Sequence, residues 1–165
     1  MSGHTPLLLI DVDGVISLFG FDHTDPPPGC PIAVDGTPHW IAAGAGARLI
    51  RLARTFECVW CTGWEERAEE HLPALLGLPG GWEHLCFGPV AADWPRGHWK
   101  LEAIEAFAGP QRPVAWLDDT HDDFCSTWVA ARQGPTLLVS TDPAVGLTDE
   151  HVSVLESWAR ANGSI

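Results

Sequence analysis

Residues 7–15 have the sequence Leu7-Leu8-Leu9-Ile10-Asp11-Val12-Asp13-Gly14-Val15, in which an apolar run ends in two aspartates and a glycine. We expect a buried β-strand here, and the alternation of its side chains places Asp11 and Asp13 on one side of the chain. Gly14 permits a sharp turn immediately afterwards. Two carboxylates this close cannot both ionise without a proton or a cation between them. The stretch therefore predicts a metal site.

The rest of the chain alternates short apolar segments with amphipathic, helix-like segments. Strands are predicted at residues 6–11, 56–61, 113–118 and 136–140, with a weaker one near 84–88. Helices are predicted at residues 45–55, 65–76, 99–108, 122–132 and 149–161. Strands that alternate with helices indicate a parallel sheet. We therefore expect an α/β protein with a three-layer α/β/α, Rossmann-like fold and a mostly parallel central sheet.

The length and composition predict one domain over residues 1–165. A chain of 165 residues that is 45% hydrophobic can bury one substantial core. Residues 16–40 are rich in Pro and Gly and predict a loop or irregular hairpin that projects from the sheet edge as a flap. Residues 77–98 predict a second short, irregular insert. Neither insert is long enough to form an independently folded cap domain.

The charge balance limits the classes of partner. Nine Lys and Arg residues against 22 Asp and Glu residues give a formal net charge of −13, which disfavours nucleic acid. We find no local basic patch that would compensate. The N-terminus lacks a secretory signal pattern, and no apolar stretch is long enough to span a bilayer. We expect no membrane association and a cytoplasmic location, while the oligomeric state is left open.

The cysteines predict free thiols. They are five in number and scattered along the chain: Cys30, Cys58, Cys61, Cys86 and Cys125. An odd, unframed set does not indicate a disulfide framework. Cys58 and Cys61 match a C-x-x-C pattern, but they lie in a predicted strand, where residues three apart face opposite sides. We therefore disfavour a zinc or redox role for this pair.

Side chains that suit phosphate chemistry follow the other predicted strands. Thr62 and Gly63 come after the second strand, just before a helix whose N-terminal amides can bind an anion. Lys100 lies at the start of another helix, and Asp118-Asp119 end the strand that begins near residue 113. In an open parallel sheet, ligands bind beyond the carboxyl ends of the strands. We expect these groups to converge there with the acidic pair of the first strand.

This set of groups matches the needs of phosphoryl transfer. The reaction requires a nucleophile, a proton donor for the leaving group and positive charge around the transferring oxygens. A carboxylate can accept the phosphoryl group as an aspartyl phosphate, which divides one difficult displacement into two easier ones. Mg²⁺ prefers oxygen ligands from one or two carboxylates. Asp11 or Asp13, with Asp118 or Asp119, would supply them.

In this order, the motifs resemble those of the haloacid dehalogenase (HAD) superfamily, which is dominated by Mg²⁺-dependent phosphatases. The motifs are Asp11-Val12-Asp13-Gly14-Val15, Thr62-Gly63, Lys100 and Asp118-Asp119, and the resemblance covers residues 6–140. The two short inserts resemble the capless or minimally capped members of the superfamily. The chain is also similar to phosphatase-like modules of RNA repair proteins, although the motifs do not establish that substrate.

The resemblance implies a role for each motif residue. Asp11 would be the nucleophile, and Asp13 the general acid that protonates the leaving group and then activates water. The backbone carbonyl of Asp13 would be a metal ligand, together with the Asp11 carboxylate. Lys100 would neutralise charge on Asp11 and on the phosphate.

The remaining motif residues would bind the phosphate and the metal. Thr62 and the Gly63 amide would hold the phosphoryl oxygens. Asp118 would bind Mg²⁺ directly or through water, with Asp119 beside it. Which of the two lies closer to the metal is left open.

Aromatic and polar residues beside the motifs are secondary candidates. Trp64 and Trp99 flank the expected site and could stack on an aromatic leaving group such as a nucleobase, although packing is the commoner use of Trp. His121 could touch the site. Asp122 and Asp123 are favoured as residues of a helix start, with outer support of the metal site as the alternative.

The predicted function is that of a Mg²⁺-dependent phosphomonoester hydrolase acting through an aspartyl phosphate on Asp11. One alternative is a catalytically quiet HAD-fold binding or regulatory module, and another is a phosphotransferase or a nucleic-acid-end phosphatase. The net charge favours a phosphorylated small molecule over a macromolecule as substrate. The sparse cap, however, would leave the site open to either.

Overall fold

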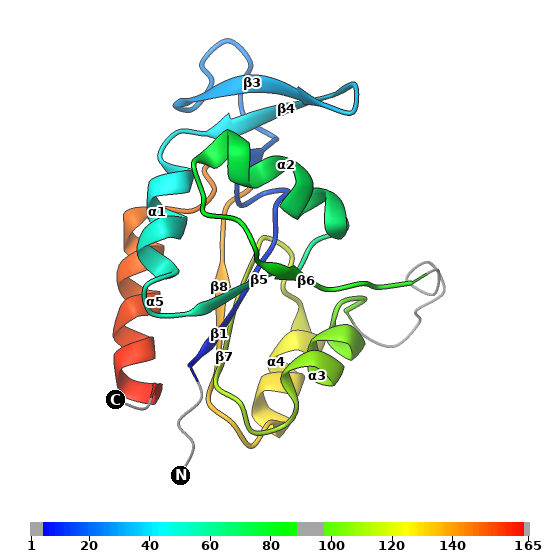
Figure 1. Ribbon diagram of the computed structural model, residues 1–165, viewed down its shortest axis with the longest axis vertical. Coiled ribbons are helices and arrows are strands. Elements are labelled where there is room, and N and C mark those ends of the chain that lie inside the picture. The colour runs from blue at the N-terminus through cyan, green and yellow to red at the C-terminus, as the bar shows by residue number, and fades with distance from the viewer. Residues whose placement is uncertain (1–4, 89–97, 164–165) are drawn as a thin grey trace.

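A five-stranded, wholly parallel sheet forms the centre of the molecule (Figure 1). This computed structural model describes residues 5–88 and 98–163. The strands lie in the order β6-β5-β1-β7-β8, and their bounds are Leu7–Ile10 for β1, Glu57–Trp60 for β5, Glu83–His84 for β6, Val114–Asp118 for β7 and Thr136–Ser140 for β8. The first strand thus lies at the middle of the sheet, with β5 and β7 on either side.

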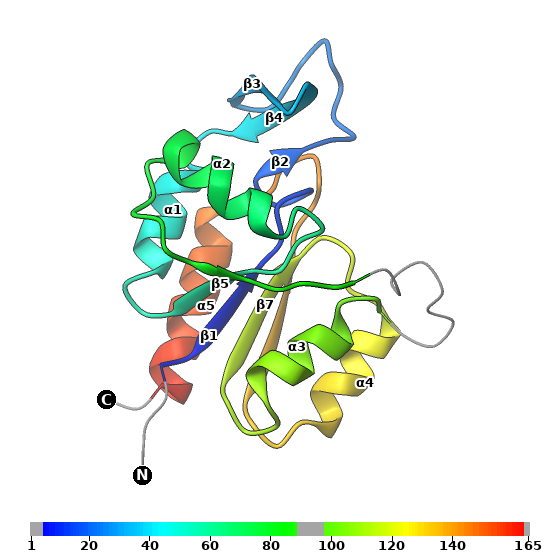
Figure 2. The same cartoon turned by 45° about the vertical axis from the view of Figure 1, so that its right-hand side comes forward.

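Helices cover both faces of this sheet. Their bounds are Ala45–Leu52 for α1, Glu66–Leu76 for α2, Leu101–Ala108 for α3, Asp123–Ala131 for α4 and Asp149–Asn162 for α5. Figures 1 and 2 show α1 and α5 on one face and α3 and α4 on the other. The predicted three-layer α/β/α fold with a mostly parallel sheet is therefore confirmed.

The side chains of β1 explain why both faces must be covered. Leu8 and Ile10 pack into the core under α1 and α5, and Leu7 and Leu9 pack into a second core under α3 and α4. All four side chains are fully buried. Each such burial stabilises the fold by roughly 1.5–3 kcal/mol, so a strand that is apolar on both faces favours a central position.

The flap insert is more regular than its composition predicted. Within it, β2 (Ser17–Leu18), β3 (Gly29–Val34) and β4 (Thr37–Ala42) form an antiparallel sheet in the order β2-β4-β3. Asp35 and Gly36 connect β3 to β4 with φ angles of 50° and 78°, the positive values that a tight two-residue hairpin requires. The insert therefore contains a true hairpin instead of an irregular one, and Figure 2 shows it beyond the carboxyl ends of the central strands.

Strands β3 and β4 were not predicted from the sequence because they contain prolines, which normally disfavour strands. Pro31 lies in the edge strand β3, where a missing N–H leaves no neighbour unpaired. Pro38 lies in β4 but beyond Trp40 and Ile41, the two residues that pair with β2. Both positions tolerate proline without breaking the sheet.

The second insert adds an edge strand. In it, β6 pairs in parallel with β5 through Val59↔Glu83 and Trp60↔His84, slightly earlier than the strand predicted near 84–88. The part of the insert at residues 89–97 lies outside the described residues. The other predicted elements begin and end within three residues of the observed bounds.

Two further sequence expectations concern the cysteines and the membrane. All five cysteines are free thiols, as predicted. Burial raises the pKa of the Cys58 thiol to about 12, which disfavours the thiolate that a zinc site would need. None of the helices in the described ranges combines the length and apolar character that a bilayer span requires.

Candidate active site

The candidate site forms where three neighbouring strands end. Asp11 follows β1 directly, Thr62 lies two residues after β5, and Asp118 is the last residue of β7. Because β5 and β7 flank β1 in parallel, these three residues emerge at the same sheet edge. This edge is where ligands bind in open parallel sheets.

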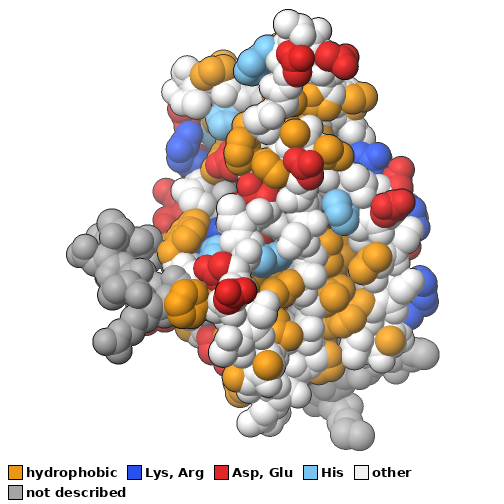
Figure 3. All heavy atoms as spheres, turned by 180° about the vertical axis from the view of Figure 1, so that it is seen from behind, with side chains coloured by type: hydrophobic (Ala, Val, Ile, Leu, Met, Phe, Trp, Pro, Cys, Tyr) orange, Lys and Arg blue, Asp and Glu red, His pale blue; other side chains and the backbone are white. Residues whose placement is uncertain are grey.

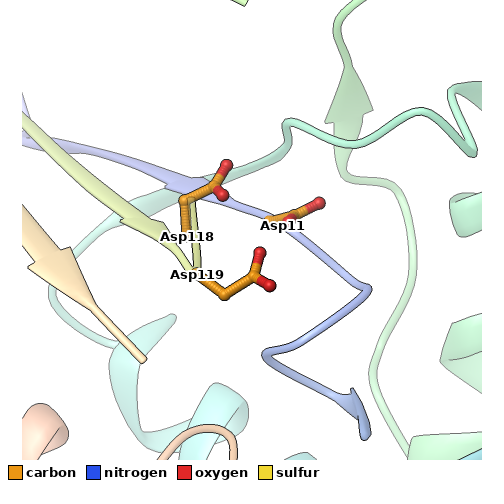
Figure 4. A group of neighbouring side chains, drawn as sticks. All are labelled: Asp11, Asp118 and Asp119. Atoms are coloured by element: carbon orange, nitrogen blue, oxygen red, sulfur yellow. The ribbon is translucent and has the colours of Figure 1, made fainter. Parts of the chain in front are cut away.

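Three carboxylates gather at the centre of this edge. One oxygen from each of Asp11, Asp118 and Asp119 lies within 4.8 Å of the others, and Figure 4 shows these side chains close together at the ends of their strands. Asp11 is 6% exposed and Asp118 is fully buried. A compact set of hard oxygen donors suits Mg²⁺, so the residues present fit the predicted metal.

Gly14 makes room for one of these carboxylates. Its φ of +81° places it in the left-handed region, and a Cβ added there would overlap the Asp119 carboxylate. The Thr141 hydroxyl donates a 2.7 Å hydrogen bond to the Gly14 carbonyl and holds the turn in place. A side chain at position 14 would therefore displace Asp119.

A single buried ammonium balances the acids. Lys100 Nζ lies 3.1 Å from Asp11 Oδ1 and 2.5 Å from Asp118 Oδ2, and the lysine side chain is only 2% exposed. Lys100 is the only lysine in the chain. It precedes α3, whose start brings it under the ends of β1 and β7. One ammonium thus serves two carboxylates.

The oxygens of Asp118 are fully occupied by donors. Lys100 and the Trp116 indole N–H both contact Oδ2, the latter at 3.2 Å. The Thr120 amide and hydroxyl both donate to Oδ1, at 3.0 and 2.9 Å. Two donors on each oxygen use the acceptor capacity of the carboxylate. Asp118 is consequently the most firmly held acid of the site.

The pKa shifts of the site residues follow from how many hydrogen-bond donors and charges surround each of them. Burial raises the pKa of Asp11 to about 7, against the opposing attraction of Lys100. Asp118 is also desolvated, but Lys100 and the hydrogen bonds from Thr120 lower its pKa. Burial acts to lower the pKa of Lys100, but the combined attraction of its acidic neighbours, chiefly Asp11 and Asp118, outweighs burial and raises it. Burial therefore disfavours the carboxylate form of Asp11 despite the nearby ammonium, and a bound divalent cation would favour that form.

Asp13 lies apart from the acid cluster. Its side chain is 54% exposed, and its Oδ2 accepts a 3.0 Å hydrogen bond from the Trp64 indole N–H. His39 Nδ1, from β4 of the flap, lies 4.0 Å from the other carboxylate oxygen. The carboxylate is thus placed at the rim of the site, between the flap and the segment that follows β5.

A cavity of about 290 Å³ opens onto these groups. Six predicted site residues line it together with two that the sequence did not indicate, the complete lining being Asp11, Asp13, Phe19, Gly63, Trp99, Lys100, Asp119 and Thr120. Thr62, Trp64 and Asp118 lie behind this lining and are buried. The structure therefore brings the predicted residues together, in two layers.

A protein-family model described as "HAD domain in Swiss Army Knife RNA repair proteins" matches residues 7–152. The chain belongs to this HAD family. The resemblance to the haloacid dehalogenase superfamily is thereby confirmed. A search of curated proteins finds no match to the chain.

The HAD motif residue Thr62 occupies a wholly buried position. Its side-chain oxygen accepts a 3.2 Å hydrogen bond from the Trp64 amide, which leaves the hydroxyl proton available for another acceptor. The Thr62 carbonyl accepts from the Glu65 amide and begins the turn into α2. Gly63, in contrast, faces the cavity.

Two secondary candidates pack around the HAD motifs. His121 Nδ1 lies 2.9 Å from Ser140 Oγ, its ring meets Trp116 edge-on, and burial lowers its pKa to about 4. Asp122 is the N-cap of α4 and accepts a 3.1 Å hydrogen bond from the Cys125 amide. The helix-start interpretation of Asp122 is therefore confirmed.

Phe19 and Thr120 line the HAD site but were missed in the sequence. Thr120 carried a signal, because an Asp side chain commonly accepts a hydrogen bond from the backbone N–H two residues on, as Asp118 does here. Phe19 carried none, since it follows the short strand β2 inside the Pro- and Gly-rich insert. It is 50% exposed and reaches the cavity only because the flap lies over this edge.

Proposed function

We propose that this protein is a phosphomonoester hydrolase that requires Mg²⁺ and forms an aspartyl phosphate on Asp11. The observation that carries the proposal is the buried Asp11 carboxylate, paired with Lys100 and adjoining Asp119 at the wall of an open cavity. Membership of the HAD family supports phosphatase-like chemistry in general. The ion, the intermediate and the substrate are the parts proposed here.

Asp11, Asp119 and the backbone carbonyl of Asp13 are the residues we assign to the metal. Asp118 is less suited to direct ligation, because its four hydrogen-bonding positions are taken by Lys100, Trp116 and Thr120. It would instead hold Lys100 in place and support the metal through water. When bound, Mg²⁺ supplies positive charge that offsets the charge on the phosphoryl oxygens.

The residues of the chain then divide the reaction into two displacements. An Asp11 oxygen attacks phosphorus while the bond to the ester oxygen breaks, and Asp13 gives its proton to the departing oxygen. The Asp13 carboxylate next takes a proton from the water that attacks the aspartyl phosphate, which releases inorganic phosphate and restores Asp11. Lys100, Thr62 and the Gly63 amide stabilise the charge of the transferring group.

The test is hydrolysis of 4-nitrophenyl phosphate with Mg²⁺ and with a chelator. We expect turnover that depends on Mg²⁺, and a fall of at least about 10³-fold in Asp11→Asn. Asp123→Asn, at the exposed start of α4, is the matched control and should keep full activity. Borohydride reduction of enzyme that is acid-quenched during turnover should reduce the aspartyl phosphate and so convert position 11 to homoserine.

The same experiment tests the alternative that this protein is a catalytically quiet binding or regulatory module. Absence of Mg²⁺-dependent turnover on a broad panel of phosphomonoesters would favour a binding or regulatory role. Normal turnover in Asp11→Asn would instead show that another group is the nucleophile. Transfer to an added alcohol in place of water would indicate a phosphotransferase.

A second candidate is a phosphatase that acts on nucleic-acid ends. Two observations favour it: the matched family is described by RNA repair, and Phe19 and Trp99 give the cavity aromatic surface on which a base can stack. The net charge of −13 favours a phosphorylated small molecule instead. Comparing a mononucleotide 3′-phosphate with a 3′-phosphorylated RNA oligomer distinguishes the two. A cytoplasmic location is part of either proposal.

A further inference from the structure

The carboxyl group of Asp13 is exposed to solvent, but a hydrogen bond restrains it. About half of the side chain faces solvent, and an unrestrained carboxylate at such a position samples several rotamers. The Trp64 indole N–H lies 3.0 Å from Oδ2 and restricts this freedom. A hydrogen bond to a carboxylate is stronger than a neutral one, so it can fix the orientation even near solvent.

The indole itself is fixed from three directions. The Trp64 side chain is only 7% exposed. Its amide donates to the buried Thr62 oxygen, its ring packs against His39 at 4.7 Å between centroids, and the Arg67 guanidinium lies 5.9 Å from its centroid. A rigid donor next to a mobile acceptor sets the position of the acceptor.

The flap contributes to this arrangement. His39 comes from β4, and Ser17 from β2 lies 2.9 Å from its ring nitrogen. Through His39, the flap sheet contacts the indole ring of Trp64. The acid of the site is therefore held jointly by the flap and by the segment after β5.

We propose that Trp64 is a positioning residue that aims the Asp13 carboxyl at the leaving-group oxygen. This inference rests on the proposed hydrolase function. As the Asp11 oxygen bonds to phosphorus and the ester bond breaks, the proton moves from Asp13 to the departing oxygen. With Oδ2 engaged by the indole N–H, Oδ1 carries that proton, and its direction depends on Trp64.

The test exploits the chemistry of the leaving group. Poor leaving groups depend on protonation, whereas 4-nitrophenolate departs with little help. We would measure kcat/KM for a series of substituted phenyl phosphates, from 4-nitrophenyl to unsubstituted phenyl, in the wild type and in Trp64→Phe. The substitution keeps an aromatic ring beside His39 and removes only the N–H donor and part of the ring.

The expected result is a steeper dependence on leaving-group acidity in Trp64→Phe. The variant should lose about tenfold more activity on phenyl phosphate than on 4-nitrophenyl phosphate. The ratio of the two rates does not depend on the folded fraction, so partial misfolding cannot imitate the effect. Trp128→Phe is the matched control, because it removes an indole N–H that donates to Glu105 at 2.9 Å outside the cavity.

The outcomes separate this inference from the function on which it rests. An equal loss on all substrates, or the same change of slope in Trp128→Phe, would overturn the role of Trp64 while the hydrolase function stands. Absence of turnover of every ester by the wild type would overturn both. A steeper slope in Trp64→Phe alone supports the inference.

Discussion

Lys100 forms two buried ion pairs with carboxylates that have different roles. Its partner Asp11 faces the cavity, and its partner Asp118 lies behind it. Removing one member of a buried ion pair typically costs about 3–5 kcal/mol, because the remaining charge is left uncompensated. The same ammonium thus supports both the fold of the sheet edge and the charge state of the proposed nucleophile.

At Gly14, we predict that Gly14→Ala weakens the stabilisation of the protein by Mg²⁺. The new Cβ would overlap the Asp119 carboxylate and push it out of the acid cluster. Gly36→Ala is the control, since its φ of +78° imposes similar backbone strain but its Cβ would meet no atom within 4 Å. Without metal, backbone strain should cost Gly36→Ala about 1–2 kcal/mol, and Gly14→Ala should lose more because its Cβ also displaces Asp119.

Thermal unfolding with and without Mg²⁺ checks this prediction. The increase in Tm on adding Mg²⁺ should shrink in Gly14→Ala and persist in Gly36→Ala. An unchanged increase in both variants would show that Asp119 does not contribute to metal binding.

The individual site residues were predictable only in part. The order of the motifs identified which acids gather, because strand ends in a parallel sheet meet at one edge. Hydrogen-bond partners were not predictable, since they depend on side chains from distant segments. Trp64 illustrates this: its position left both packing and stacking on a substrate open, and nothing in the sequence indicated that its N–H bonds to Asp13 or that its ring packs against His39.

The capping box at the start of α5 contains a residue that titrates, His151. The Thr148 amide donates to His151 Nδ1 at 3.1 Å, which requires that nitrogen to be unprotonated. Burial lowers the pKa of His151 below its ordinary value of 6.5, although Glu150 opposes the shift. Below pH 6.5 the unfolded chain therefore binds more protons than the folded one, and stability falls as the pH falls.

Because protonation of His151 destabilises the folded state, we predict that the stability of His151→Gln falls less than that of the wild type as the pH is lowered. Glutamine can fill the same place in a capping box and does not titrate. The free energy of unfolding of the variant, relative to that of the wild type, should rise as the pH is lowered from 7.5 through 6.5 and toward 5. Urea titrations at several pH values measure it, and parallel curves for the two proteins would contradict the prediction.

Helix α1 lies so close to the end of α2 that replacing a glycine of α1 by alanine should destabilise the protein, the opposite of the usual effect. Alanine is normally a better helix residue than glycine by about 1 kcal/mol. At Gly46, however, an added Cβ would overlap the backbone carbonyl of Leu76. We expect Gly46→Ala to lose about 1–3 kcal/mol of stability in urea unfolding. A gain in stability would mean that the two helices separate at little cost.

Elements were more predictable than their exact bounds. The apolar run of β1 and the alternating pattern after it specified the layers, because a strand that is apolar on both faces must be covered twice. The sheet in the flap was not predicted, since Pro31 and Pro38 are strand breakers in most settings. They are tolerated here because of an edge position and a short neighbouring strand, which only the topology shows.

At the scale of the whole molecule, the excess of acidic residues is the main feature. Figure 3 shows Asp and Glu side chains across one face, with the Lys and Arg groups toward its margins. The net charge of −13 repels polyanions. A long nucleic-acid substrate would therefore approach the site against an unfavourable field.

The charge predicts an unusual salt dependence for any activity on RNA ends. Proteins that bind a phosphate backbone lose affinity as salt increases. Here added salt should instead raise kcat/KM for a 3′-phosphorylated RNA oligomer, because it screens repulsion. A mononucleotide 3′-phosphate should respond less. A steep loss of activity on the oligomer with salt would indicate a basic binding surface on this chain or a partner.

The single lysine has a practical consequence for spectroscopy. Reductive methylation with ¹³C-labelled formaldehyde would place one labelled dimethylamino group on a side chain, at Lys100, besides the label on the terminal amine. Because this ammonium is almost entirely enclosed, the rate of labelling measures how often the sheet edge opens. The resulting methyl signal would report ligand arrival from inside the site, without any engineered residue.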